Sequence, residues 1–287
     1  MAPIGRGRVR NALSVDVEEW FQVGAFENVI DKGDWDSFAP RVAQNTDAVL
    51  SLFAETGVKA TFFTLGWIAK RHPALIRRIV AQGHEIASHG WDHQRVFTMT
   101  ADRFRADLLM ARQTIEDAAG VAVTGYRAPS FSIDQRTPWA HQVLADAGYS
   151  YSSSVAPVVH DHYGWPDAPQ TAFHPVDGSD FVELPVTLAS VAGRKITTGG
   201  GFFRLLPGAI TYRAIDRLNR DAQRPAVFYF HPWEIDPDQP RVAAAPLRSR
   251  LRHYSRLGAM LGKLRTLIAR HEWDRTDAVV AAERVRP

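Results

Sequence analysis

Short apolar segments alternate with amphipathic segments through most of the chain, and turn residues separate many of them. The segments predicted as strands are residues 12–16, 59–65, 84–88, 124–127, 149–153 and 225–230. The segments with helical spacing are residues 42–56, 73–82, 100–119, 137–147, 207–219 and 255–271. Repeated β–α units with short connections favour a parallel sheet or barrel with helices packed outside it. This pattern predicts the α/β class.

The chain is long enough for one large domain or two small ones, since it has 287 residues. Residues 160–200 are rich in proline and short β-like runs, which indicates a loop or hairpin insertion. Residues 245–272 form a C-terminal helical segment. No internal repeat or linker is evident, so we expect a single domain over residues 1–287.

Composition excludes several classes of site. There is no cysteine, which excludes disulfides, iron–sulfur clusters and thiolate zinc sites. Lys and Arg exceed Asp and Glu by only 34 − 31 = 3, so nucleic acid is not expected as a partner. No apolar run resembles a signal peptide or a membrane span, which predicts a soluble cytoplasmic protein.

Charge is nonetheless uneven along the chain. Seven basic residues and no acid lie between Arg248 and Arg270. A solvated helix face is the ordinary explanation for such a run. Contact with an acidic surface or with anionic lipid head groups at the inner membrane face is the alternative.

Polar clusters follow four of the predicted strands. They are residues 16–19 (Asp-Val-Glu-Glu), 88–93 (Ser-His-Gly-Trp-Asp-His), 127–130 (Arg-Ala-Pro-Ser) and 231–234 (His-Pro-Trp-Glu). Sites in parallel α/β folds form where strands end at their carboxyl side. One strand-end acid or histidine is usually structural, but four clusters in one chain predict a shared site.

Histidine and carboxylate side chains in these clusters suit a divalent metal. His89 and His93 are four residues apart and would share a face on one helical turn. Strand alternation puts Glu18 on the same side as Asp16 and puts Glu19 on the other. The third ligand is therefore expected to be Glu18 rather than Glu19, or else Asp16, with the other of these two carboxylates left for acid–base chemistry. Zinc is the first choice of metal, and cobalt, iron, manganese or nickel would suit similar donors.

The remaining polar residues suit acid–base chemistry. A metal would lower the pKa of a bound water molecule, and the carboxylate of Asp16 or Glu18 that does not bind the metal would accept the proton. Arg127 would keep that carboxylate ionised and aimed. His231 would then act as the general acid for the leaving group.

These motifs, in this order, resemble those of the NodB-type polysaccharide deacetylases, carbohydrate esterase family 4. The longer strings are similar to the branch associated with exopolysaccharide biosynthesis and exosortase loci in bacteria. Those strings are residues 14–22 (SVDVEEWFQ), 125–132 (GYRAPSFS), 198–204 (TGGGFFR) and 230–236 (FHPWEID).

The resemblance implies a deformed (β/α)7 barrel and metal-dependent N-deacetylation of an acetamido sugar. Matched by position, Asp16 is the family's base and Glu18 its acidic metal ligand. His89 and His93 are the metal histidines. His231 is the acid, and the family's arginine that pairs with the base corresponds to residue 127. The expected partner is an N-acetylated glycan, with contact to a membrane or lipid-linked glycan and self-association as further expectations.

Substrate contacts are expected from residues inside the motif strings: Pro129, Ser130, Trp91 and Trp233. The sequence also departs from the family pattern. Glu18 stands where an Asp is usual, Ser130 replaces an aromatic residue, and the fourth motif has no clear match, although Asp161, Tyr163 and Trp165 lie near its expected place.

Two other functions remain open from the sequence. One is a deacetylase-fold amidohydrolase acting on a small amide or cyclic imide, which would need a small closed pocket. The other is a carbohydrate-binding barrel without catalytic activity. A groove lined by tryptophans would favour a polymer substrate.

Overall fold

In the computed structural model, residues 9–159 and 163–285 are described. Eight strands form one sheet: β1 (Arg10–Val17), β2 (Thr61–Thr64), β3 (Glu85–Ser88), β4 (Gly125–Tyr126), β5 (Tyr151–Ser152), β6 (Val182–Glu183), β9 (Val227–Phe230) and β10 (Glu272–Asp274). A separate antiparallel hairpin joins β7 (Leu188–Val191) and β8 (Arg194–Thr197).

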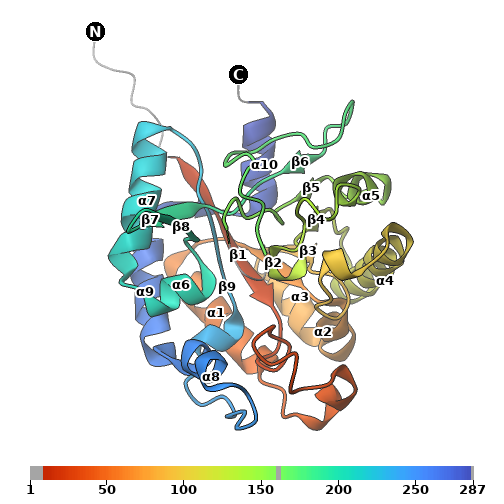
Figure 1. The fold of residues 1–287 in the computed structure, drawn as a ribbon, viewed down its shortest axis with the longest axis vertical. Coiled ribbons are helices and arrows are strands. Elements are labelled where there is room, and N and C mark those ends of the chain that lie inside the picture. Colours follow the sequence, from red (N-terminus) through yellow and green to blue (C-terminus); the bar gives the residue numbers. More distant parts are fainter. Residues whose placement is uncertain (1–8, 160–162, 286–287) are drawn as a thin grey trace.

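Helices surround the sheet (Figure 1). They are α1 (Val42–Thr56), α2 (Gly66–Arg71), α3 (Pro73–Ala81), α4 (Ala101–Ala119), α5 (Ala140–Asp146), α6 (Gly200–Leu205), α7 (Gly208–Asp221), α8 (Leu247–Tyr254), α9 (Leu257–Arg270) and α10 (Thr276–Arg284). Short 3-10 turns over Pro129–Phe131 and Pro232–Ile235 follow β4 and β9.

The sheet is parallel throughout and curls into a barrel. Seven strands follow one another in the order β9, β1, β2, β3, β4, β5, β6, and β10 lies beside the start of β1. Thr187, just beyond β6, exchanges two hydrogen bonds with Val227 of β9, at 3.3 and 2.8 Å. The two outer strands therefore meet, and the predicted deformed (β/α)7 barrel is confirmed.

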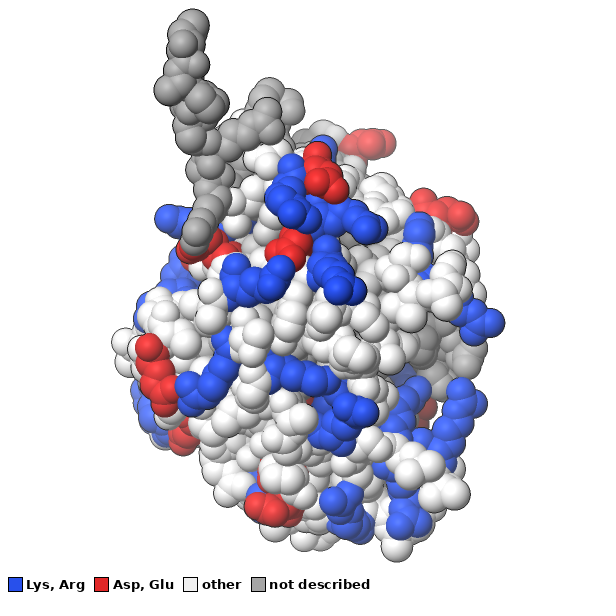
Figure 2. All heavy atoms as spheres, turned by 90° about the vertical axis from the view of Figure 1, so that its left-hand side faces the viewer, with Lys and Arg blue, Asp and Glu red and all other residues white. Residues whose placement is uncertain are grey.

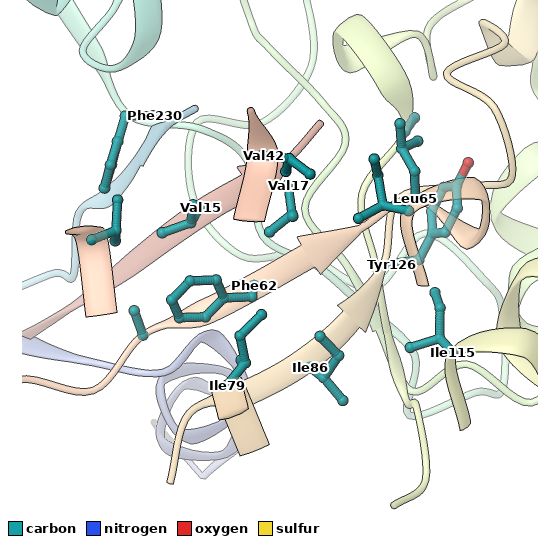
Figure 3. Packing of buried hydrophobic residues seen from close by; sticks show 14 of the residues in the cluster. Val15, Val17, Val42, Phe62, Leu65, Ile79, Ile86, Ile115, Tyr126 and Phe230 are labelled. Atoms are coloured by element: carbon teal, nitrogen blue, oxygen red, sulfur yellow. The ribbon is translucent and has the colours of Figure 1, made fainter. Parts of the chain in front are cut away.

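Side chains of β1 alternate between two environments. Val15 and Val17 face outward and pack with Phe62, Leu65 and residues of the surrounding helices in the largest apolar cluster (Figure 3). Their neighbours Ser14 and Asp16 point into the barrel. This period of two is the ordinary geometry of a strand. The outer apolar face anchors the strand, and the inner face is free to carry polar chemistry.

Two of the predicted helices end at residues of types that commonly cap helices. The hydroxyl of Thr100 accepts a hydrogen bond from the Arg103 N–H and caps α4. Gly57 and Gly120 end α1 and α4 with φ of 72° and 70°. Only glycine adopts this left-handed conformation without steric cost.

Within the range 160–200, the described residues 163–200 form the hairpin β7–β8 and also supply β6 to the sheet. With only two residues, β6 is too short to produce a recognisable alternation of apolar and polar side chains. Among the described residues, no helix is both long and apolar enough to cross a membrane.

Candidate metal centre and active site

The four predicted polar clusters meet at one end of the barrel. Asp16 and Glu18 come from the end of β1, His89 and His93 follow β3, and His231 follows β9. These five residues line one cavity of about 230 Å3. The carboxyl ends of parallel strands therefore form the site, as the fold class predicts.

Three side chains of this cluster have metal-ligand geometry. One donor atom each from Glu18, His89 and His93 lies within 4.8 Å of the other two. The Nδ1–H of His89 donates to the backbone carbonyl of Arg127 at 2.8 Å, which leaves its Nε2 as the ligand nitrogen. Burial lowers the pKa of His89 to about 4, so this imidazole is neutral at ordinary pH. A neutral imidazole is the form that binds metals.

Each carboxylate oxygen of Glu18 has a close neighbour on another side chain. Oε1 accepts a hydrogen bond from the indole N–H of Trp233 at 3.0 Å. Oε2 lies 2.9 Å from Nε2 of His93. Burial would raise the pKa of Glu18, but the imidazoles of His93 and His231 outweigh it and hold that pKa well below its usual range. The carboxylate is thus ionised and fixed in orientation.

Glu18, His89 and His93 form a set of donor atoms that fits a divalent metal. Although Oε2 of Glu18 is buried, it forms no hydrogen bond of acceptable geometry in the described part of the chain. Such an atom is costly unless a cation or a donor satisfies it. One carboxylate and two imidazoles are typical ligands of catalytic zinc, with a coordination position left for water or substrate. These residues therefore suit a metal of the zinc class.

The loop between the two histidines corrects one sequence inference. Residues 89–93 are not helical, so the predicted shared face of a helical turn is wrong. Instead, Gly90 and His93 both adopt left-handed backbone conformations, with φ of 78° and 61°. The tight loop brings the two imidazole rings to a centroid distance of 5.6 Å. Left-handed backbone at a non-glycine residue costs free energy and often marks a functional position.

Glu19 faces away from the cluster. Its carboxylate accepts hydrogen bonds from the backbone N–H groups of Arg41 and Val42, at 2.9 to 3.1 Å, and so satisfies the first turn of α1. Burial raises the pKa of Glu19 to about 7, despite these hydrogen bonds. Glu19 therefore has a structural role, since it satisfies backbone N–H groups at the N-terminus of α1.

Asp16 forms a buried ion pair with Arg127 across the barrel interior. Nη1 of Arg127 donates to Oδ1 of Asp16 at 2.7 Å and to Oγ of Ser14 at 2.7 Å. The other guanidinium nitrogens donate to the carbonyl and hydroxyl of Ser153. Both charged side chains are almost fully buried. The fixed arginine therefore orients one oxygen of Asp16 and leaves the other facing the cavity.

His231 lies close to the carboxylates of both Asp16 and Glu18. Its Nε2 lies 3.7 Å from Glu18 and 4.0 Å from Asp16. Its Nδ1 contacts Oε2 of Glu234 at 3.0 Å. Burial lowers the pKa of His231, but the carboxylates of these three acids outweigh it and raise that pKa to about 9. The protonated ring is the form that can donate a proton.

Two residues that sequence reasoning did not assign support His231. Glu234 is buried between His231 and Arg204, whose Nε donates to its Oε1 at 3.1 Å. Arg204 also donates to the backbone carbonyls of Arg252 and Ser255. Both residues lie in the strings 198–204 and 230–236. The spacing His-x-x-Glu was the available signal, since three residues span one turn after the strand.

The predicted substrate contacts divide into two groups. Ser130 and Trp233 line the cavity, as does Tyr163. Trp91 packs against Gly66 and Pro129 lies behind Gly90, and neither is among the lining residues. Asp161 lies outside the described residues. Instead of offering an open ring, Trp233 is stacked between His231 and His253, at centroid distances of 5.1 and 4.4 Å.

Family comparisons divide the chain into two parts. Residues 30–152 match the family described as "Polysaccharide deacetylase". Residues 153–281 match a family described as "Domain of unknown function (DUF3473)". The first range contains His89, His93 and Arg127, whereas Asp16 precedes it and His231 lies in the second. The barrel therefore assembles its site from both ranges and from the strand before them.

Similar proteins share parts of the chain. A peptidoglycan deacetylase from Helicobacter pylori is 32% identical over 107 residues, 37% of this chain and 36% of that protein. A chitooligosaccharide deacetylase from Sinorhizobium fredii is 40% identical over 108 residues, 37% of this chain and 50% of that protein. The matches thus span half or less of these relatives. The crystal structure of a suspected polysaccharide deacetylase from Mycobacterium smegmatis has a TM-score of 0.64 at 23% identity and covers 99% of this chain and 94% of that one, so the fold is shared.

Proposed function

Because the chain carries a NodB-type polysaccharide deacetylase domain over residues 30–152, we propose that it is a metal-dependent hydrolase that removes N-acetyl groups from a polysaccharide or oligosaccharide. The observation that carries the proposal is the convergence of Glu18, His89 and His93 beside Asp16 and His231 in one cavity. We further propose that the substrate belongs to bacterial exopolysaccharide biosynthesis, which rests on the longer sequence strings.

Each side chain has a distinct part in this reaction. Glu18, His89 and His93 would hold a divalent cation, zinc first, which supplies Lewis acidity beside the acetamide. Asp16 takes the proton from the attacking water, because its free oxygen faces the cavity while Arg127 fixes the other. His231 donates a proton to the departing amine nitrogen. The raised pKa of His231 supports this assignment, since the group must start protonated.

The cavity has room for a chain substrate beyond the reacting sugar. A second cavity of about 470 Å3 shares Val23, Gly24, His93 and Arg95 with the first. A glycan that reaches past His93 would occupy both. This arrangement supports an oligosaccharide rather than a small cyclic amide. Tryptophan side chains do not add support for a polymer substrate. The indole N–H of Trp233 is already hydrogen-bonded to Glu18, and Trp91 does not line the cavity.

The extent of the catalytic unit is also proposed. We take residues 1–287 as one deacetylase domain, supported by the sheet that runs from β9 through β1 to β6 across both family ranges. Self-association and the compartment in which the protein works stay predictions from the sequence.

Acetate release from a panel of N-acetylated oligosaccharides tests the activity. The protein is stripped of metal with a chelator and assayed before and after zinc, cobalt or manganese is restored. We expect activity only with metal, and a loss of about 10²–10⁴-fold in Asp16→Asn and His231→Gln with metal still bound. Asp36→Asn, an exposed acid paired with Arg71, serves as the control and should keep full activity.

The rival functions give different results in the same assay. Turnover of a cyclic imide or small amide without acetate release would replace the deacetylase proposal with an amidohydrolase. Glycan binding without any turnover would indicate an inactive barrel. Full metal occupancy in both His89→Ala and His93→Ala, measured by elemental analysis, would contradict the ligand assignment.

A further inference from the structure

Helix α8 exposes two leucines to solvent beside the cavity. Leu247 and Leu251 are 67% and 59% exposed and lie one helical turn apart. Arg248 and Arg252 occupy the same outward face, whereas His253 points inward and stacks on Trp233. Exposed apolar side chains rimmed by basic ones on the same helix face are typical of an interaction surface. We call these four outward residues the α8 face.

The cations of the α8 face are available to a partner. Neither Arg248 nor Arg252 forms an ion pair within the described residues. Further along the segment, Arg265 pairs with Glu55, Arg270 pairs with Asp216, and Lys263 donates to three backbone carbonyls at the end of α6, whereas Arg256 forms no ion pair within the described residues. The run of basic residues noted in the sequence is therefore not a uniform solvated face. Arg248 and Arg252, each directly after one of the two leucines in the sequence, are among the cations of this run that form no ion pair within the described residues.

The surrounding surface has the same sign. Figure 2 shows that Lys and Arg predominate over Asp and Glu on the side of the molecule that carries α7, α8 and α9. Arg252 also lines the cavity that contains the candidate metal ligands Glu18, His89 and His93. The α8 face and the mouth of the site are thus continuous, and an object bound to one lies next to the other.

We propose that the α8 face docks on an anionic lipid bilayer, with both leucines at the boundary between head groups and acyl chains. Arginines beside exposed leucines complement lipid phosphates and the apolar layer beneath them. A second copy of the chain would complement them poorly, because a two-fold contact sets each arginine against its equivalent. A soluble anionic glycan would engage the arginines but leave the leucines in water.

Docking in this way would turn the site towards the membrane surface. If the proposed deacetylase function holds, a glycan attached to a lipid would be presented to the cavity past Arg252. The docking itself does not depend on that function. A vesicle assay needs no catalysis, so failure of the two proposals can be told apart.

Co-sedimentation with vesicles tests the proposal. The full chain is mixed with phosphatidylcholine vesicles and with vesicles that also contain phosphatidylglycerol. We expect binding to the anionic vesicles alone, weakened by salt. Arg248→Gln should reduce the binding constant about fivefold, and Leu247→Ser with Leu251→Ser should reduce it at least about tenfold.

Matched variants on another helix provide the control. Leu109 and Met110 of α4 are 51% and 46% exposed, and their replacement by serine should leave vesicle binding unchanged. The leucine pair variant should still release acetate from a soluble oligosaccharide at the normal rate. Absence of vesicle binding, equal binding to neutral vesicles, or a loss matched by the α4 variant would overturn the proposal. So would a leucine-dependent dimer, seen by sedimentation velocity without lipid.

Discussion

The charge on His231 should make the stability of the metal-free protein fall as pH rises. Three carboxylates, those of Glu18, Glu234 and Asp16, raise the pKa of His231 to about 9 against the opposing effect of burial. In the unfolded chain this pKa is about 6.5. The folded state therefore binds the proton more tightly, and its contribution is fully present below the unfolded pKa. It is lost as pH rises through the folded pKa.

The size of the effect follows from that difference. About 2.5 pKa units at about 1.4 kcal/mol each give at most about 3.5 kcal/mol. Between about pH 7.5 and about pH 9.5, the loss should be about 2 kcal/mol. Glu19, Glu85 and Asp107, whose pKa values burial raises to about 7, lower the stability as pH rises through the range below this window. Buried tyrosines whose pKa values are raised, such as Tyr149, also begin to lower the stability near the top of the window, so the contribution of His231 is read from the difference between the wild type and His231→Gln.

Urea unfolding of chelator-treated protein across this window measures the effect. The free energy of unfolding of the wild type should fall by about 2 kcal/mol more than that of His231→Gln. His72→Gln is the matched control, because burial lowers the pKa of His72 and no step above neutral pH is due to it. Restored metal should shrink the wild-type step, since a cation on Glu18 offsets the charge that attracts the proton.

Two results would refute this reasoning. If His231→Gln loses as much stability with rising pH as the wild type, the step belongs to another group. If the wild type shows no step at all, the carboxylates near His231 do not hold its proton, and its role as an acid loses its support.

Further predictions concern the metal ligand, its hydrogen bond and the loop behind it. Glu18→Gln should lose metal, whereas Glu19→Gln should keep metal and lose about 1 kcal/mol of stability with its helix cap, by elemental analysis and urea unfolding. A Glu19 variant that lost metal would reverse the assignment. Trp233→Phe should weaken metal affinity about 10–100-fold by removing the hydrogen bond to the ligand, measured by competition with a chelating dye. Gly66→Ala should cost about 1–3 kcal/mol, because its Cβ would lie 2.6 Å from the Trp91 ring; an unchanged unfolding midpoint would contradict that packing.

Local patterns in the sequence predicted many of the strands and helices. Apolar runs predicted β1, β2 and β9, and helical spacing predicted α1 and α4, because these features depend on neighbours along the chain. The two-residue strand β6 left no such signal. It is a strand only because β5 holds it in register, with Tyr151 opposite Val182. Short barrel strands are therefore determined by their partners rather than by their own residues.

The site shows the same division between local and tertiary causes. Strand alternation predicted that Asp16 and Glu18 share a side and that Glu19 faces elsewhere, and the hydrogen bonds of Glu19 agree with it. Spacing alone misled for His89 and His93, because four residues suggest a helical turn as readily as a tight loop. The backbone at Gly90 and His93, with φ above 60°, decides between them.

Partners from distant segments were the hardest to foresee. Glu234 is placed by Arg204, thirty positions earlier, and Arg204 is placed by carbonyls at the end of α8. No periodic pattern links these segments. A buried carboxylate between a histidine and an arginine follows from tertiary packing, which brings α6, α8 and the end of β9 together.

The pairing of Arg127 with Asp16 depends on the curvature of the sheet. Arg127 follows β4, and Asp16 lies on β1, with β2 and β3 between them. In a flat sheet, three strand spacings of about 4.8 Å would set the two about 14 Å apart, beyond the reach of the side chain. The observed distance is 2.7 Å, so the sheet must close far enough for one wall to touch the other. Hydrogen bonds between Thr187 and Val227 provide that closure on the far side. The orientation of Asp16 is thus a consequence of the barrel as a whole, and residues far from the cavity help to set it.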